Sequence, residues 1–212
     1  PINTIIGGVA ASISTKALLA TKLGISEFRI MRFEVVGSDI NCNINGEYSM
    51  ASNAFYNDLN ITKYIDLNGL CTVINQLAFN NASNLTEAYF PGKVFIGGNA
   101  FWNATKLASL FIENASNVMS GSLRNTGLEE IKITSTITID QTQIWQNNSK
   151  LKRLLIPNIK GNIQHSSILN IPLLEVLQAD NIEYMGNGNF FSNFPLLPIV
   201  NLPSLKSMSY NS

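Results

Sequence analysis

Apolar and polar positions recur along this chain with a period of about 22 residues. In "GGNAFWNATKLASLFIENA", residues 97–115, an Ala-Phe pair follows two glycines, and an Asn stands two residues after the Phe. Three spaced apolar residues follow, which are Leu107, Leu110 and Ile112. Related phrases begin at Asn53, Leu77, Ser122, Ile144, Ile168 and Phe190. Because self-similarity at a fixed period of this length is typical of stacked repeats, the sequence predicts a solenoid.

The clearest marker of the repeat is one asparagine in each copy. These residues are Asn57, Asn81, Asn103, Asn125, Asn147, Asn170 and Asn193. An apolar row keeps nearly the same rhythm, at Leu67, Phe90, Ile112, Ile133, Ile156, Ala179 and Leu202. Drift of one or two residues between copies is expected in turns. The two rows therefore indicate one continuous series of coils.

Each copy predicts one short strand whose side chains alternate between core and surface. Leu110 and Ile112 are expected to point inward, and Phe111 between them is expected to point outward. Phe101 closes the coil from the opposite side. Because one coil cannot bury its apolar face alone, neighbouring coils must stack, and this apolar stack holds the protein together.

The chain is expected to turn back after each strand. Gly97 and Gly98 provide the turn in the copy quoted above. The "NAFW" segment is expected to form one helical or 3₁₀ turn that Asn103 ends, because Asn tolerates a left-handed backbone and can hydrogen-bond locally.

The phrase AFxNxxxLxxLxI resembles the BspA-type leucine-rich repeats of bacterial and protozoal surface proteins, over residues 53–208. The Phe position of later copies holds Leu123, Trp145, Ile168 and Phe191. The family's usual Cys after the Asn is replaced by Ala82, Ala104 and Thr126. The resemblance implies a right-handed leucine-rich repeat solenoid, with a parallel β-sheet on one face and short 3₁₀ or irregular returns. We expect about seven coils over residues 51–212.

Residues 1–50 precede the first clear copy and predict a mixed α+β cap. The segment 12–25 has helical spacing of Ala and Leu, residues 27–37 favour a strand, and residues 40–44 favour a second strand. Such a cap would shield the first coil. After the last copy, residues 204–212 show no cap, so a further domain, another copy of the chain or a truncated end is expected there.

Composition limits the possible partners. Charged residues make up 13% of the chain and apolar residues 45%, and 14 basic residues balance 14 acidic ones. Without a basic run, neither nucleic acid nor a membrane surface is an expected partner. No apolar stretch is long enough for a membrane-spanning helix. Cys42 and Cys71 lack metal or redox spacing, so buried free thiols are expected.

The sequence offers little enzyme chemistry, and we predict no catalytic, cofactor-binding or metal-binding residues. The single histidine, His165, precedes Ser166 and Ser167, but adjacent side chains on an extended chain point apart. At the start of the fourth strand, one side chain of the Glu129-Glu130 pair is expected to face solvent and the other the turn. No calcium-binding or phosphate-binding loop motif is present.

Several asparagines lie in Asn-x-Ser/Thr sequons, at Asn60, Asn81, Asn84, Asn103, Asn114 and Asn147. In a secreted eukaryotic protein these would be glycosylation sites. Asn-rich composition also produces sequons without any glycan. For Asn81, Asn103 and Asn147, a turn or ladder role within the repeat is an alternative.

The best candidate for partner binding is the row of outward side chains on the predicted sheet. It comprises Tyr89, Phe111, Lys132, Leu155, Gln178 and Asn201, with Asp66 expected at the start. Large apolar groups at surface positions can mark an interface. Alternatively, they only stabilise the sheet, or another chain covers the later coils.

The resemblance implies a non-enzymatic recognition or adhesion module. It would be extracellular or at a cell surface and would bind a protein or glycan through the sheet face. The alternative is a structural subunit of a larger assembly, such as a phage virion fibre or decoration protein. In that case its partners would be further copies of itself or other subunits of the virion.

Overall fold

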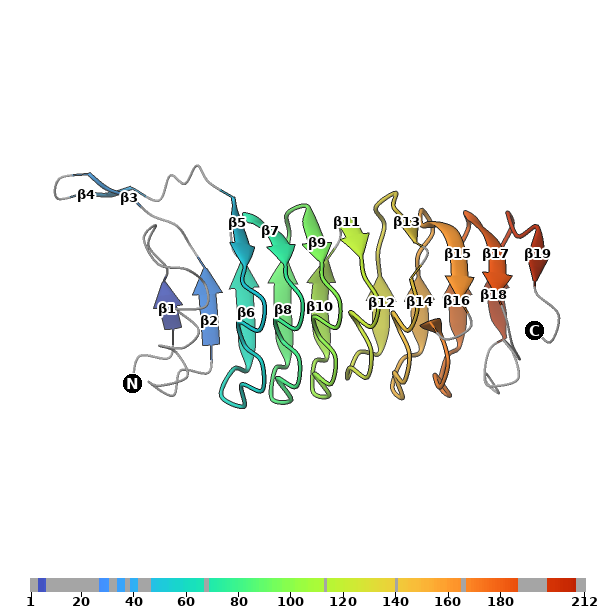
Figure 1. Ribbon diagram of the computed structural model, residues 1–212, viewed down its shortest axis with the longest axis horizontal. Helices are drawn as coiled ribbons and strands as arrows, with labels where there is room; N and C mark the ends of the chain where they lie inside the picture. Colours follow the sequence, from blue (N-terminus) through green and yellow to red (C-terminus); the bar gives the residue numbers. More distant parts are fainter. Residues whose placement is uncertain are drawn as a thin grey trace.

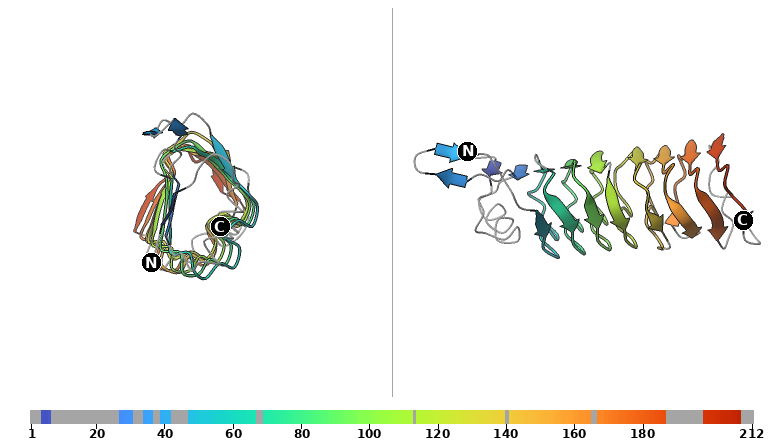
Figure 2. Two further views of the ribbon diagram at one scale, coloured as in Figure 1. Left: turned by 90° about the vertical axis from the view of Figure 1, so that its left-hand side faces the viewer. Right: turned by 90° about the horizontal axis from the view of Figure 1, so that it is seen from above.

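The structure is a computed structural model that describes 47–66, 69–112, 114–139, 141–164, 167–186 and 198–208, together with the backbone of four short N-terminal strands. The chain winds into coils that lie side by side along the long axis (Figure 1). Viewed from the end, successive coils superpose as one outline (Figure 2). The predicted parallel-strand solenoid is confirmed.

The first strand of each coil belongs to a strip of sheet that we call the first strip. All its neighbouring pairs are parallel. Its strands within the coils are β6 (Lys63–Asp66), β8 (Glu87–Phe90), β10 (Ser109–Ile112), β12 (Glu130–Lys132), β14 (Arg153–Leu155), β16 (Val176–Gln178) and β18 (Ile199–Asn201).

Each coil also contains a second strand, on the return path. These strands form the second strip, which is likewise parallel: β5 (Tyr48–Met50), β7 (Cys71–Ile74), β9 (Val94–Ile96), β11 (Ala115–Val118), β13 (Thr138–Ile139), β15 (Lys160–Gln164), β17 (Ile182–Gly186) and β19 (Ser207–Met208). The return is thus an irregular turn joined to a short strand, which the sequence had not indicated.

The N-terminal segment contributes four strands. β1 (Thr4–Ile6) and β2 (Glu27–Ile30) pair in parallel and extend the first strip beyond β6. β3 (Glu34–Val36) and β4 (Asp39–Asn41) form an antiparallel pair. The strand expected over 27–37 is therefore two strands, and β4 falls at the start of the strand expected over 40–44. The helix expected over 12–25 and Cys42 lie outside the described residues.

The return turns show why the sequence repeats an asparagine. Backbone N–H groups alternate between a bond within the turn and a bond to the next coil: Tyr56 N donates to Asn53 O at 3.1 Å, and Phe55 N donates to Ala78 O at 2.7 Å. Two residues per turn, four apart, have positive φ, a conformation that Asn and Gly adopt most readily. The first residue of each pair is Asn53, Leu77, Asn99, Gly121 or Gln143. The second is Asn57, Asn81, Asn103, Asn125 or Asn147, and Asn170 has the same conformation.

Gly97 and Gly98 do not take the left-handed conformation, so their role differs from the turn that we expected. A Cβ on Gly97 would lie 2.7 Å from backbone atoms of residues 74–76 in the preceding coil. A Cβ on Gly98 would meet its nearest neighbour, Ser120 O, only at 3.6 Å. Gly97 therefore permits close backbone packing between coils.

The core runs through the middle of the stack. Phe79 stacks between Phe55 and Phe101, with ring centroids 5.1 and 5.0 Å apart. Across the coil, Tyr64 stacks on Phe90 at 5.3 Å. In later coils the Phe position is filled by other side chains that are equally buried, namely Leu123, Trp145 and Ile168.

Both strips are interrupted at the same level of the solenoid. β10 ends one sheet and β12 begins another, and β11 and β13 likewise belong to different sheets. Figure 1 shows wider spacing between β10 and β12 than between the neighbouring pairs. The return turns remain bonded across this level, since Phe101 N donates to Ser122 O at 2.9 Å. Only the strands separate, and we call this place the strand break.

Candidate partner-binding face

The outward side chains of the first strip align in register. Ile65, Tyr89 and Phe111 occupy equivalent positions of β6, β8 and β10. Beyond the strand break, the same position holds Lys132, Leu155, Gln178 and Asn201. These seven residues form what we call the sheet-face row.

The expected placement of Asp66 at the start of this row is wrong. Asp66 is only 1% exposed, and its Oδ2 accepts a 2.8 Å hydrogen bond from Cys71 N. Its strand partner is therefore the buried Phe90 position rather than Tyr89. The apolar row of the sequence pairs Leu67 with Phe90, whereas in the structure Ile65 pairs with Tyr89, which differs from that register by one residue. A shift of one residue moves every side chain of a strand to the opposite face of the sheet. Ile65 stands at the start of the row instead.

An aromatic pair dominates the first half of the sheet-face row. The rings of Tyr89 and Phe111 stack with centroids 4.8 Å apart at 22°. Phe111 remains 39% exposed, while Ile65 and Tyr89 are half-buried. Beyond the strand break the row becomes polar except for Leu155, and Asp180 accepts hydrogen bonds from both Gln178 (3.0 Å) and Asn201 (2.8 Å). The continuous apolar part of the row, Ile65, Tyr89 and Phe111, thus lies in the early coils.

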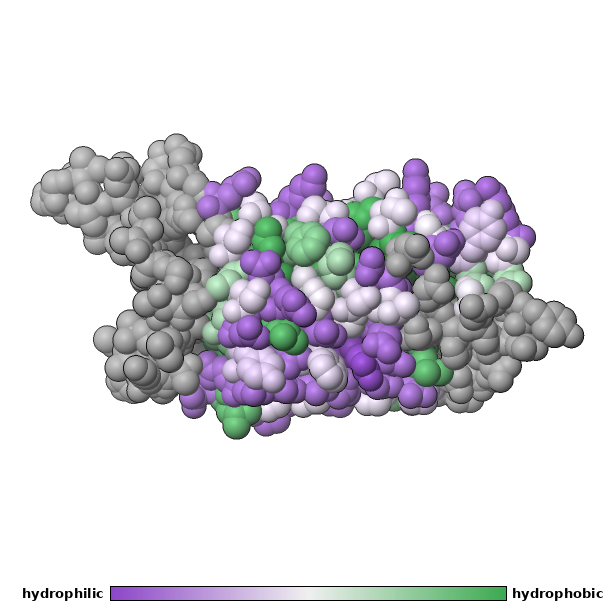
Figure 3. Space-filling view, in the orientation of Figure 1, coloured by the Kyte–Doolittle hydropathy of each residue, from purple (hydrophilic) through white to green (hydrophobic). Residues whose placement is uncertain are grey.

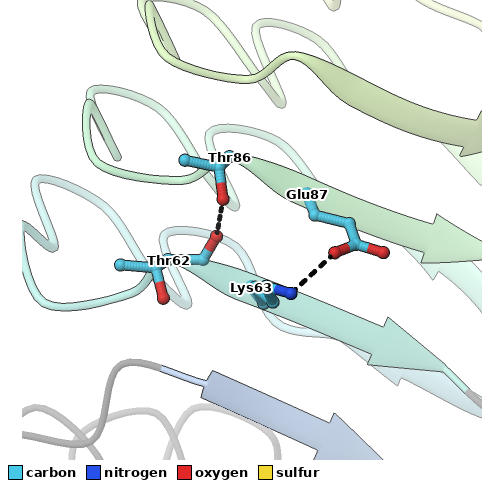
Figure 4. A network of polar contacts seen from close by, with 4 residues as sticks. All are labelled: Thr62, Lys63, Thr86 and Glu87. Atoms are coloured by element: carbon cyan, nitrogen blue, oxygen red, sulfur yellow. Dashed lines mark hydrogen bonds and ion pairs between the residues drawn. The ribbon is translucent and has the colours of Figure 1, made fainter.

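Charged side chains beside the row pair with the neighbouring coil. Lys63 Nζ lies 3.1 Å from Glu87 Oε2, and Thr86 Oγ1 donates to Thr62 O at 2.9 Å (Figure 4). Both contacts join one coil to the next.

Glu129 and Glu130 are both exposed, and each pairs with the next coil: Glu129 with Lys152 at 2.9 Å, and Glu130 with Arg153 at 3.0 Å. The hydrogen bond from Lys152 lowers the pKa of Glu129, and the same bond raises the pKa of Lys152. The contribution of this pair to stability is present above the ordinary pKa of Glu and is lost as pH falls through the lowered value. The expected division, with one carboxylate facing the turn, is not what the structure shows.

The strand break opens a groove in this face. The groove has a volume of about 510 Å³, and its walls include Leu110, Phe111, Glu129, Glu130 and Lys132. Beneath it lies a small apolar space walled by core residues that include Ile112 and Ile131. Leu110 is only partly buried, whereas the equivalent Ala88 and Leu154 are fully buried. We call this the break groove, and it is a concave site whose walls combine apolar side chains with charged ones.

Lys132 forms one wall of the break groove. It is exposed, and it makes no ion pair within the described part of the chain. A partner could therefore place an apolar group over Phe111 and an acidic group beside Lys132. The sequence contained a signal for this site, because the step from Phe111 to Lys132 is 21 residues, shorter than the neighbouring steps of 22 and 23.

The candidate chemistry found in the sequence does not form a reactive site among the described residues. Ser167 is buried and donates to Gln141 O at 2.9 Å, while His165 and Ser166 lie outside the description. Cys71 is a buried free cysteine. In the described ranges, no three His, Cys, Asp or Glu residues gather as a metal site. The same ranges contain no helix that is long and apolar enough to cross a membrane.

The asparagine row lies on the return turns, away from the sheet-face row. Asn81 Nδ2 donates to Asn57 Oδ1 at 2.9 Å, and Asn103 and Asn125 each continue this pattern, at 2.8 and 2.6 Å. A further bond of 2.9 Å joins Asn170 to Asn147. Asn193 lies outside the described residues. We call the run from Asn57 to Asn125 the Asn ladder.

Comparison with known proteins gives one match. The model of the BspA-type leucine-rich repeat region matches residues 38–120 and 95–197, with six copies. No curated protein and no solved structure matched the chain. The matched ranges include the strands that carry the sheet-face row through β16, as well as the Asn ladder.

Proposed function

This chain belongs to the BspA-type leucine-rich repeat family, and from that premise we propose that it is a recognition module that binds a protein partner through the sheet-face row. Members of the family are generally interaction or adhesion modules and are typically associated with surfaces. Their solenoid is generally a binding scaffold without enzymatic activity. We place the site of action at a cell surface and assign no catalytic role.

The observation that carries this proposal is the Tyr89–Phe111 stack beside the break groove. Aromatic side chains bury a large area at low entropic cost and are enriched among residues that dominate binding energy. Phe111 is 39% exposed and also forms part of the wall of the groove. An apolar protrusion on a partner protein can fill the groove, and the neighbouring ion pairs can surround it with a polar rim.

The test replaces Tyr89 and Phe111 together with serine. We expect affinity for a protein partner to fall at least roughly tenfold, because the main apolar contact is lost. The melting temperature should change little, because neither side chain belongs to the buried core. Surface plasmon resonance against a panel of immobilised extracellular proteins would measure binding, and circular dichroism would measure melting.

Tyr184→Ser provides a matched control. Tyr184 is an aromatic residue on β17 of the second strip and is 45% exposed. Its replacement should leave binding unchanged. Unchanged binding of the Tyr89/Phe111 double variant would rule out the sheet-face row as the binding surface.

A second candidate function is that of an assembly subunit, such as a component of a virion fibre or decoration layer. It is favoured by β18, where Val200 occupies the inward register of Leu177 but is 42% exposed, and Ile199 is 55% exposed. Apolar surface of this kind is suited to cover by another copy of the chain.

If the chain is an assembly subunit, the purified protein should sediment as a multimer, and the backbone amides of β18 and β19 should be protected from hydrogen exchange. A monomer with freely exchanging β18 amides would contradict it.

A further inference from the structure

A second groove runs along the return turns of the early coils, separate from the sheet-face row. It is open and has a volume of about 530 Å³. Its walls come from the Asn ladder and from residues two positions further along each turn: Asn57, Leu59, Asn81, Ser83, Asn103, Thr105 and Asn125. We call it the ladder groove. The face of the molecule shown in Figure 3 is mainly hydrophilic over the described coils, with small separate hydrophobic patches.

The amides of the Asn ladder retain hydrogen-bonding capacity. An Asn side chain has two N–H donors and an oxygen with two lone pairs. Asn81 and Asn103 each use one donor and one lone pair within the ladder. Each therefore keeps one donor and one acceptor, and the same pair of functions is repeated from coil to coil.

The backbone holds these amides in a fixed arrangement. Asn57, Asn81, Asn103 and Asn125 all have φ between 51° and 62°. Neighbouring parallel strands lie about 4.8 Å apart, so the four amides extend over roughly 14 Å. The ladder groove is therefore a preorganised linear array, which lowers the entropic cost of binding a ligand.

The ladder groove ends where the Asn ladder ends. No hydrogen bond joins the side-chain amides of Asn125 and Asn147. Instead, the Oδ1 atom of the neighbouring Asn148 accepts a hydrogen bond from Thr126 N at 2.7 Å. Two residues after Asn125, Gly127 has no side chain to continue the wall. The length of the site is thus set by the chain itself.

The ladder groove carries no charged side chain. Lys106 lies beside it but donates to Asn84 Oδ1 at 2.8 Å. The hydroxyl groups of Ser83 and Thr105 make no hydrogen bond within the described part of the chain, so both are available to a ligand. A charged ligand would lose hydration without gaining an opposite charge. The groove therefore favours a neutral ligand with many groups that both donate and accept.

We propose that the ladder groove binds a neutral linear polysaccharide, with its hydroxyl groups paired to the free amide functions of Asn81 and Asn103. Sugar hydroxyls both donate and accept, which matches one free donor and one free acceptor per coil. Ser83 and Thr105 add hydroxyl contacts. Leu59, which is 58% exposed, supplies an apolar contact for the C–H face of a sugar ring at one end.

The test titrates the full chain with neutral linear hexasaccharides, namely cellohexaose, xylohexaose and hexa-N-acetylchitohexaose. Binding is followed by calorimetry and by the side-chain amide NMR signals of Asn81 and Asn103. We expect saturable binding of at least one hexasaccharide, with shifts confined to the Asn ladder. Ser83→Tyr should weaken binding at least roughly tenfold, because the larger side chain fills the groove.

Ser149→Tyr is the matched control. Ser149 has the same place two residues after a repeat Asn, and its N–H donates to Asn147 O, as Ser83 N–H donates to Asn81 O. It lies beyond the ladder groove, so its replacement should leave sugar binding unchanged. The Tyr89/Phe111 serine variant should also bind sugar normally, which separates this inference from the proposed protein-binding face.

Three outcomes would overturn the inference. The first is no binding of any of the three hexasaccharides at millimolar concentration. The second is binding that Ser83→Tyr leaves intact. The third is preference for an oligogalacturonate or an extended peptide over every neutral sugar, because the groove would then be recognising charge or a polypeptide backbone.

Discussion

Single residues fix the distance between coils. Asparagines with positive φ form the turns, and Gly97 lets the backbone of one coil approach the preceding one. Glycine is therefore needed for two different reasons in this fold. At Gly121 and Gly161 the backbone is left-handed, with φ of 65° and 99°, whereas at Gly97 the need is for space.

Adjacent glycines should respond in opposite ways to alanine. Gly97→Ala places a methyl group 2.7 Å from backbone atoms and should lower the free energy of unfolding by at least about 2 kcal/mol. Gly98→Ala meets nothing closer than 3.6 Å and should be neutral or stabilise by about 0.4–1 kcal/mol. Urea denaturation of both variants measures the difference. Similar losses in the two would show that both positions need glycine for its backbone freedom.

At the scale of elements, the buried side-chain amide of Asn148 links two neighbouring coils on the far side of the strand break. Asn148 Nδ2 donates to Leu123 O at 2.8 Å and to Trp145 O at 2.7 Å, and its Oδ1 accepts from Thr126 N and Thr126 Oγ1, both at 2.7 Å. Earlier coils have buried alanines at the equivalent positions, Ala82 and Ala104. At this level a hydrogen-bonded Thr126–Asn148 pair thus takes the place of the buried Ala82 and Ala104 of the earlier coils.

Removal of this amide should be costly, and a second substitution should restore part of the loss. Asn148→Ala leaves several buried groups without partners and should lower the free energy of unfolding by roughly 2–4 kcal/mol. Adding Thr126→Ala recreates the earlier coils, where Ala104 N donates to Phe101 O at 3.1 Å. Chemical denaturation of the single and double variants gives the coupling energy. A double variant less stable than Asn148→Ala alone would contradict this account.

The strands of the two strips differ in how well the sequence predicts them. The strand of each copy and its inward side chains were predictable, because apolar residues recur at the same place in most coils. The return strands were not, because segments such as residues 71–74 and 115–118 share little composition. Asp66 was misplaced because an extra residue in the first coil shifts the pairing by one.

The two binding surfaces were unequally visible in the sequence. The outward positions of Tyr89 and Phe111 follow from alternation along a strand. The break groove depends on the separation of β10 from β12, to which only the step of 21 residues points. The ladder groove depends on which lone pairs the Asn ladder uses, and no pattern of residue types contains that information.

At the scale of the whole molecule, the strand break divides the solenoid into two blocks. Coils interact only with their neighbours, so stability is a sum of coil and interface terms. The interface at the break lacks the strand-to-strand hydrogen bonds present at the other levels and keeps those of the return turns. It should therefore be the weakest interface in the stack.

Hydrogen exchange should detect these two blocks. In mild denaturant we expect residues 47–118 and 120–186 to exchange as separate cooperative units. Protection should be greatest in the middle strands, such as β8 and β14. Mass spectrometry of peptic fragments measures this, with unfolding in strong denaturant as the reference for full exchange. A single cooperative transition for all fragments would show that the break has no energetic effect.

The strand break also determines how the protein would respond to tension. A molecule anchored at one end and pulled at the other carries the load through every level in series, and the level with the fewest bonds yields first. Separation there would lengthen the molecule while the coils on either side stayed wound. An optical trap should then record a first, small extension before the coils themselves unravel.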